Sequence, residues 1–162
     1  MDAQSRVRAA VLTISDRVSA GQMRDSSGPA LRELLLRQGY EVAEVETVPD
    51  ERSRIAGWLQ GNAAEHNLLV TTGGTGLAPR DVTPQAVQGV SDYEIPGLGE
   101  VMRQRGLAQT PMSALARSLA AVLGSTLVLA LPGSEAGARE SLEAVLPVLD
   151  HALGLLNGEN RH

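Results

Sequence analysis

Short apolar runs rich in β-branched residues alternate along this chain with segments of helical periodicity. Residues 7–14 and 68–72 have the composition and length of buried strands. Between them, apolar residues recur at helical spacing after a start near residues 27–29 and again after Asp50. Strands that are joined through helices lie parallel in a sheet, with the helices on its faces. The alternation therefore predicts an α/β fold, a three-layer α/β/α sandwich around a mostly parallel sheet.

Two stretches carry a weaker pattern. Residues 41–48 alternate apolar and charged side chains, which predicts one strand near an edge of the sheet, and Asp50 is expected to cap the next helix. Between Ser91 and Gln109, the pair Pro96-Gly97 is expected to open a short helix. No linker or repeat interrupts the chain, so a single domain over residues 1–162 is expected.

The last third of the chain predicts a hairpin and a long helix. Residues 115–123 and 126–131 flank Gly124-Ser125 as two strands, and this hairpin adds a late antiparallel strand to the sheet. Leucines and valines from 142 to 156 follow helical spacing. Pro147 lies inside that pattern and is expected to kink or restart the helix, because proline lacks the N–H donor.

The segment TTGGTG at residues 71–76 places a glycine-rich turn between a predicted strand and a predicted helix. Its glycines allow backbone N–H groups to approach an anion closely. Thr83 is expected to cap the next helix with Pro84 at its first position, so that the positive end of the helix faces the loop. Asp81 places a carboxylate beside the loop, where a divalent cation could join it to phosphate oxygens. The alternative is a tight connection that binds nothing, with Asp81 as a helix cap.

Two common phosphate-binding signatures do not fit this loop. All 14 Lys and Arg residues are arginine, so a P-loop lysine and a Schiff-base lysine are excluded. The dinucleotide fingerprint fails because Pro79 occupies its third glycine position. A cation that binds phosphate here must therefore be an arginine or a metal ion.

Composition narrows the classes of partner. A net charge of −5 with a pI near 5.2 argues against duplex nucleic acid or an anionic membrane as the main partner. The absence of cysteine excludes disulfides and thiolate chemistry. No leader and no transmembrane run is evident from the polar start of the chain onward, so a cytoplasmic location is expected.

Polar segments follow the predicted strands at the points where each of them ends. Ser15-Asp16, Asp50, the glycine loop with Asp81, and residues 132–134 all have this position. In open parallel sheets, ligands bind outside the carboxyl ends of the strands. We therefore expect several of these loops to line one cleft.

Seven short segments, in this order, resemble the Mog and MoaB family of molybdenum cofactor biosynthesis, whose molybdopterin-binding domain is related to the G domain of gephyrin. The resemblance covers nearly the whole chain, and the string TGGTG with RDVTP four residues later is highly specific. The matching segments are TISD (13–16), DSSGP (25–29), VPDE (48–51), TGGTG (72–76), RDVTP (80–84), Pro96-Gly97 with Glu100 and Arg103, and LPGS (131–134).

The resemblance implies a molybdopterin adenylyltransferase, in which ATP and molybdopterin give adenylylated molybdopterin and pyrophosphate with Mg²⁺. It implies that Asp81 and Asp50 are catalytic and bind the metal. It also implies a homotrimer or hexamer, with other molybdenum cofactor biosynthesis proteins as partners. The substrate-binding residues that it implies are Ser15, Asp16, Thr72, Gly73, Gly74, Thr75, Gly76, Glu100, Arg117, Pro132, Gly133 and Ser134.

Other interpretations remain open at the level of sequence. A non-catalytic pterin-binding scaffold would keep the pocket, and a nucleotide pyrophosphatase on the same fold would release AMP without a pterin acceptor. The family often has Ser-Arg where this chain has Ala116-Arg117, so a hydroxyl contact is missing or is taken over by Ser118. It often has Pro-Lys where this chain has Glu135-Ala136, which puts an acid in place of a base. Asp16 either hydrogen-bonds the pterin ring or only terminates a strand.

Overall fold

The computed structural model describes residues 6–159, in which the strands form one mixed, seven-stranded sheet. Residues 1–5 and 160–162 lie outside the described residues, and with them most of the polar segment at the start of the chain. The strands are β1 (Arg8–Ile14), β2 (Glu41–Val42), β3 (Glu46–Val48), β4 (Leu68–Thr72), β5 (Tyr93–Glu94), β6 (Leu119–Leu123) and β7 (Thr126–Leu131).

The strand order is β2-β1-β4-β7-β6-β5, with β3 also paired to β1. Strand β1 is parallel to β2, β3 and β4, and β4 is parallel to β7. Strand β6 runs antiparallel to both of its neighbours, β5 and β7. The predicted mostly parallel sheet with a late antiparallel strand is therefore confirmed.

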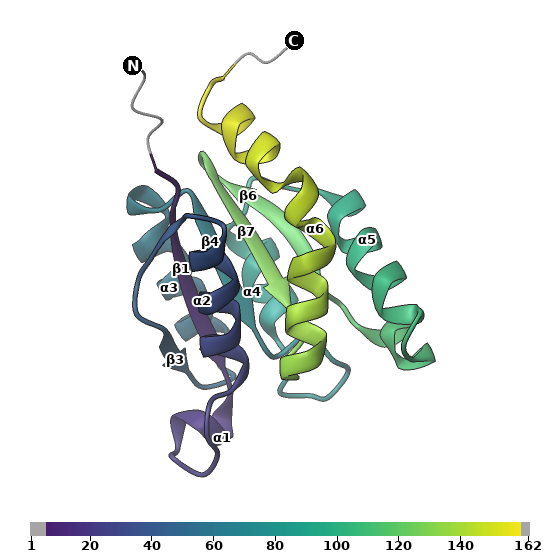
Figure 1. The fold of residues 1–162 in the computed structure, drawn as a ribbon. Coiled ribbons are helices and arrows are strands. Elements are labelled where there is room, and N and C mark those ends of the chain that lie inside the picture. Colours follow the sequence, from purple (N-terminus) through teal and green to yellow (C-terminus); the bar gives the residue numbers. More distant parts are fainter. Residues whose placement is uncertain (1–5, 160–162) are drawn as a thin grey trace.

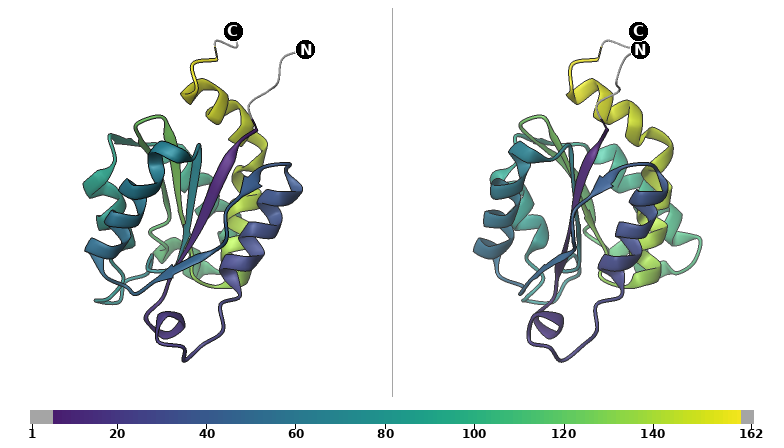
Figure 2. Two further views of the ribbon diagram at one scale, coloured as in Figure 1. Left: turned by 90° about the vertical axis from the view of Figure 1, so that its left-hand side faces the viewer. Right: turned by 60° about the vertical axis from the view of Figure 1, so that its left-hand side comes forward.

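Helices cover both faces of this sheet (Figure 2). Side chains of α2, α5 and α6 pack on one face, and those of α3 and α4 pack on the other. This arrangement confirms the predicted three layers. The helices are α1 (Asp16–Ser19), α2 (Ser27–Arg37), α3 (Arg52–Asn62), α4 (Thr83–Val90), α5 (Pro96–Leu107) and α6 (Glu135–Leu156), with 3₁₀ turns at Ala63–Glu65 and Pro111–Leu115.

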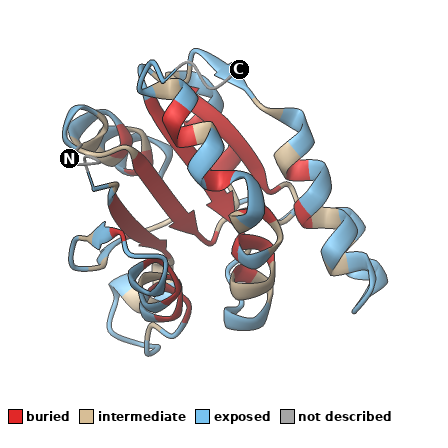
Figure 3. Ribbon diagram, turned by 45° about the horizontal axis from the view of Figure 1, so that its top comes forward, coloured by how far each residue is buried: buried red, intermediate tan, exposed pale blue. Residues whose placement is uncertain are grey.

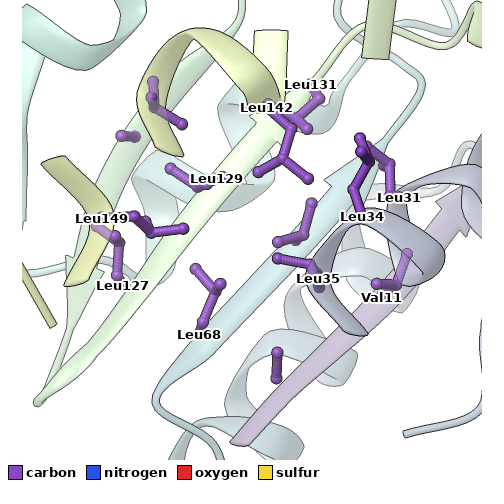
Figure 4. Close-up of a cluster of buried hydrophobic side chains, with 14 of the residues drawn as sticks. Val11, Leu31, Leu34, Leu35, Leu68, Leu127, Leu129, Leu131, Leu142 and Leu149 are labelled. Carbon is purple, nitrogen blue, oxygen red and sulfur yellow. The ribbon is translucent and has the colours of Figure 1, made fainter. Parts of the chain in front are cut away.

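The core is built from aliphatic side chains, because the chain contains no Phe. Successive residues of a strand point to opposite faces, so Leu68 of β4 joins the cluster beneath α2 and α6 while Leu69 joins the cluster beneath α3 and α4. Figure 4 shows Leu35 of α2 and Leu142 of α6 above the first of these faces. The central strands are buried, while the outer sides of the helices are exposed (Figure 3).

Two of the predicted strands are shorter than expected. Residues 41–48 form two pieces, β2 and β3, whose register against β1 differs by one residue. At the break, the carbonyls of Val42 and Ala43 accept hydrogen bonds from the Arg32 side chain. Residues 115–123 form a strand only from Leu119. Leu115 ends a 3₁₀ turn, residues 116–118 belong to neither a helix nor a strand, and the N–H of Arg117 donates to the carbonyl of Thr75 in the glycine loop.

Other elements differ from the prediction in length or continuity. The helix that begins at Pro96 is not short but runs to Leu107. Pro147 was expected to kink or restart the last helix. Helix α6 runs through Pro147 from Glu135 to Leu156 without a restart, and it bends along its length in Figure 1. The short elements α1 and β5 had no signal in the sequence pattern.

A topological switch point lies between β1 and β4. These strands are neighbours, yet the chain passes from β1 to α2 on one face and from β4 to α4 on the other face. A crevice forms at such a point because the two connections diverge. It lies at the end of the sheet near α1, opposite the end where the two termini lie (Figure 1).

Candidate functional site

The glycine loop lies against the ends of β1 and β7. The N–H of Gly73 donates to the carbonyl of Leu131 at 3.0 Å. Gly73 has a φ of 107°, and a Cβ added there would lie 2.1 Å from the carbonyl oxygen of Ile14. Only glycine fits this position, because both the backbone conformation and the space exclude a side chain.

Thr83 makes hydrogen bonds to the glycine loop and does not cap α4. Its hydroxyl donates to the carbonyl of Gly73 at 2.9 Å, and its N–H donates to the carbonyl of Gly74. Val82 occupies the cap position and makes no side-chain cap hydrogen bond. The predicted Thr83 cap is therefore wrong, and the helix begins one residue earlier than predicted, with Pro84 still in its first turn. The fully buried hydroxyl finds its acceptor in the loop instead.

Asp81 folds back over the same loop. Its Oδ2 accepts a hydrogen bond from the N–H of Ala78 at 2.9 Å, and its own N–H donates to the carbonyl of Ala78. A Cβ added at Gly76 would lie 2.8 Å from Asp81 Oδ2. The carboxylate therefore stands beside Gly76 and is not engaged in capping α4.

Asp50 and Asp16 hold each other across the ends of β3 and β1. The N–H of Asp16 donates to Asp50 Oδ2 at 2.9 Å, and the N–H of Asp50 donates to Asp16 Oδ1 at 3.0 Å. The predicted cap role of Asp50 is wrong, because α3 begins at Arg52 with Glu51 at its cap position and no side-chain cap bond. Ser15 does cap a helix, accepting from the N–H of Val18 at the start of α1.

Arg80 binds the other side of Asp16 with two parallel hydrogen bonds. Its Nε lies 2.9 Å from Asp16 Oδ2 and its Nη2 lies 2.7 Å from Asp16 Oδ1. These bonds are the main cause that lowers the pKa of Asp16, and the N–H of Asp50 adds to them. Burial raises the pKa of Asp50, and the nearby charges of Asp16 and Asp81 raise it further, against the hydrogen bond from Asp16. Two adjacent carboxyl groups are thus shifted in opposite directions.

Asp50, Asp81 and the first part of the glycine loop line one hollow of about 240 Å³, whereas Asp16 and Arg80 are not part of its wall. The structure thereby brings together half of the site residues that the sequence implied. Its wall also includes Asp25, which was not among them. The carboxylate of Asp25 accepts from the hydroxyl of Thr13 and from the N–H of Gly28. Asp25 is the first residue of the matching segment DSSGP (25–29), and that segment was the signal that could have found it. The predicted residues in this wall are Ser15, Asp50, Thr72, Gly73, Gly74, Asp81 and Gly133.

A second hollow, of about 210 Å³, shares the turn after β7. Pro132 and Ser134 line it together with Met102 of α5 and Ser118. Ser118 is 2% exposed, and within the described residues its hydroxyl has no hydrogen-bond partner. A buried hydroxyl without a hydrogen-bond partner costs free energy. A ligand that offers a hydrogen-bond partner to Ser118 would therefore be favoured here.

The remaining predicted residues lie elsewhere or are engaged by the protein. Glu100 is exposed on α5 and is not part of the wall of either hollow. The Ser134 side chain caps α6 by accepting from the N–H of Gly137. Thr75 is buried, and its carbonyl accepts from the N–H of Arg117, whose guanidinium also donates into the loop.

Comparison with known proteins identifies a family for this chain. The sequence model of a family described as "Probable molybdopterin binding domain" matches residues 10–151. The chain belongs to this family. A molybdopterin adenylyltransferase of Helicobacter pylori is 40% identical over 152 residues, which cover 91% of this chain and 86% of that protein.

Solved structures of the family share the fold. The molybdopterin biosynthesis enzyme MoaB of Thermus thermophilus has a TM-score of 0.88 and 52% identity, covering 94% of this chain and 97% of that chain.

A molybdenum cofactor biosynthesis bifunctional protein of Synechococcus elongatus is 40% identical over 153 residues. The chain spans about half the length of the bifunctional relatives that it matches, 48% in this case.

Between residues 6 and 159, none of the helices combines the length and the apolar composition that crossing a membrane requires.

Proposed function

We propose that this protein is a molybdopterin adenylyltransferase, which transfers AMP from ATP to molybdopterin and releases pyrophosphate. The observation that carries the proposal is the placement of Asp50 and Asp81 on either side of the glycine loop in one hollow. Such a transfer requires positioning and charge neutralisation and does not need a covalent nucleophile. The names of the relatives support the same reaction.

The donor set fits Mg²⁺. Asp50 and Asp81 each have one oxygen held by a backbone N–H, and Asp50 Oδ1 lies 3.1 Å from the Cβ position of Gly74. No cluster of three or more metal-binding side chains occurs among residues 6–159. Mg²⁺ commonly takes one or two carboxylates and completes its shell with phosphate oxygens and water. When bound, the ion would supply positive charge to the phosphates of ATP.

The chain itself orients the nucleotide phosphates. The N–H of Gly73 is already used by Leu131, which leaves the N–H groups of Gly74, Thr75 and Gly76 as the candidates for phosphate contact. Backbone donors of this kind are fixed before the substrate arrives, so they need little reorganisation in the transition state. Gly73 and Gly133 let the loop lie close to β1 and to the turn after β7, because a side chain at Gly73 would strike β1 and one at Gly133 would crowd Gly73.

The second hollow is the proposed place of the pterin. Ser134, Pro132 and Ser118 line it, and the unpaired Ser118 hydroxyl suits the amide and amine edge of a pterin. Ser118 would then supply the hydroxyl that Ala116 lacks. Glu135 does not oppose an anion in the first hollow, because it pairs with Arg139 along α6 and is not part of that wall.

We further propose a cytoplasmic homo-oligomer, a trimer or a hexamer, in which residues 1–162 form one molybdopterin-binding domain. Support comes from the family and from four exposed apolar residues of α5 and the following turn: Val101, Leu107, Met112 and Leu115. Light scattering that finds a stable monomer at micromolar concentration would count against it. The fused relatives support a second proposal, that another molybdenum cofactor biosynthesis protein is a partner.

One assay separates the adenylyltransferase from its alternatives. Purified protein is incubated with ATP, Mg²⁺ and molybdopterin, and the products are resolved by chromatography. Adenylylated pterin and pyrophosphate are the expected products. AMP without adenylylated pterin would indicate a pyrophosphatase, and pterin binding without turnover would indicate a scaffold.

A further inference from the structure

Arg117 is the residue through which the chain before β6 holds the glycine loop. Its N–H donates to the carbonyl of Thr75 at 2.9 Å. Its Nε donates to the carbonyl of Gly76 at 2.9 Å, and its Nη2 donates to the carbonyl of Asp81 at 2.7 Å. Its Nη1 donates to the side chain of Gln85 on α4 at 3.2 Å. One side chain thus contacts the loop at two points and the helix behind it.

The two loop carbonyls stand at either end of an exposed segment. Residues 77–80 between them are all exposed, and Arg80 is the one that reaches Asp16. The carboxylate of Asp81 stands at the end of this segment, and its hydrogen bond to Ala78 lies within it. The position of Asp81 therefore depends on how firmly the segment is held at Gly76 and Asp81.

Only arginine can make this bridge. Its planar guanidinium presents several N–H groups at fixed angles, whereas the ammonium of lysine is a point charge on a flexible stem. Three different acceptors, two carbonyls and one amide oxygen, take the three N–H groups at Arg117. Three of the five N–H groups of the guanidinium are therefore directed to acceptors of the protein itself, at both ends of the segment and on α4.

We propose that Arg117 is a positioning residue that holds the loop and thereby places Asp81, and that it is not a phosphate ligand. The role toward Asp81 rests on the proposed adenylyltransferase function. The hold on the loop itself does not depend on that function. The two statements can therefore be tested by separate measurements.

The test compares Arg117→Ala and Arg117→Lys with the control Arg37→Ala, which removes an exposed arginine paired with Glu33 on α2. Hydrogen exchange, followed by mass spectrometry, measures the amides of residues 77–82, of which Pro79 has none, and, as an internal reference, those of β4. Both Arg117 variants are expected to exchange faster at 77–82 by roughly tenfold or more, because charge-assisted hydrogen bonds to the segment are lost. The reference peptide and the control variant should be unchanged. Unchanged exchange at 77–82 in Arg117→Ala would overturn the proposal.

Adenylylation is then measured against Mg²⁺ concentration, together with molybdopterin affinity. If Arg117 positions Asp81, both Arg117 variants should need several-fold more Mg²⁺ for half-maximal rate and should keep their pterin affinity. A phosphate contact predicts instead that Arg117→Lys keeps most of the rate with wild-type loop exchange, which would contradict the proposal. A purely structural residue would lower the melting temperature and leave the Mg²⁺ dependence of the folded protein unchanged, which would also contradict it. If the wild-type protein makes no adenylylated pterin, the proposed function fails, and the exchange data still decide the hold on the loop.

Discussion

Asp16 and Asp50 exchange hydrogen bonds, each donating its backbone N–H to the carboxylate of the other, at 2.9 and 3.0 Å. This pair of bonds connects the end of β1 with the end of β3, because Asp16 and Asp50 are each the second residue after their strand. The carboxylate of Asp50 lines the hollow beside the glycine loop. Because one oxygen of Asp50 is fixed in this way, the other has a defined direction for a ligand. Four predictions rest on this geometry and on the loop beside it.

Replacing Asp81 with Asn tests its proposed metal role. The amide oxygen can still accept the hydrogen bond from Ala78, so we expect the fold to be kept. Turnover should fall by roughly two to three decades, because a metal-binding carboxylate contributes several kcal/mol of transition-state stabilisation. Molybdopterin affinity should be unchanged. Melting temperature, pterin affinity and adenylylation rate are measured on one variant, and a rate within about threefold of wild type would reject the metal role.

Asp50→Asn should separate stability from activity. Burial raises the pKa of Asp50, so the folded state holds its proton more tightly than the unfolded state does. The stability of the protein therefore decreases as pH rises from the unfolded pKa toward the raised folded pKa, and the cost is complete above it. Removing the charge should leave the melting temperature at pH 7 equal or higher, while adenylylation falls roughly a hundredfold. Thermal unfolding and rate assays at pH 7 check this, and a large loss of stability with normal specific activity would indicate a structural role.

The Asp16–Arg80 pair should stabilise the fold in the opposite pH direction. The pKa of Asp16 is lowered in the folded state, chiefly by Arg80. The contribution of this pair to the free energy of unfolding is therefore fully present above the pKa that Asp16 has in the unfolded state. It is lost as pH falls through the lower pKa of Asp16 in the folded state. Urea unfolding of wild type and Asp16→Asn should show a small difference at pH 7 that decreases as pH falls below the ordinary pKa of an aspartate, and that shrinks with added salt because both side chains are exposed. A difference that stays constant or grows as pH falls through the acidic range would show that another interaction is involved.

Gly73→Ala should destabilise the protein strongly. The new Cβ would meet the carbonyl oxygen of Ile14 at 2.1 Å in a backbone conformation that suits glycine. We expect a loss of roughly 2–4 kcal/mol in the free energy of unfolding. Gly57→Ala in α3 is the matched control, because no atom lies within 4 Å of its Cβ position, and it should gain about 0.5–1 kcal/mol. Denaturant unfolding of both variants measures the contrast, and equal stability of the two would show that β1 yields to the new side chain.

The sequence alone determined the fold class and the place of the loop. Alternating buried runs and helical segments are local patterns, and they specified the layers, the parallel strands and the glycine turn after β4. Local patterns also explain the errors. Thr83 and Asp50 both stand where a helix cap is favoured, and that preference is worth only about 1 kcal/mol.

Only the tertiary structure decided which partner each polar side chain has. The Thr83 hydroxyl bonds a carbonyl ten residues away, Asp50 bonds a residue 34 positions away, and Arg117 reaches Asp81 across 36 positions. The contact of Asp50 exists because parallel pairing of β1 with β3 brings the ends of these two strands together. The contact of Arg117 exists because β6, antiparallel to β7, starts at the edge where β4 and β7 end. The energy of such a contact depends on burial and on the register of the whole sheet. Neither of these can be predicted from the residues that flank the side chain in the sequence.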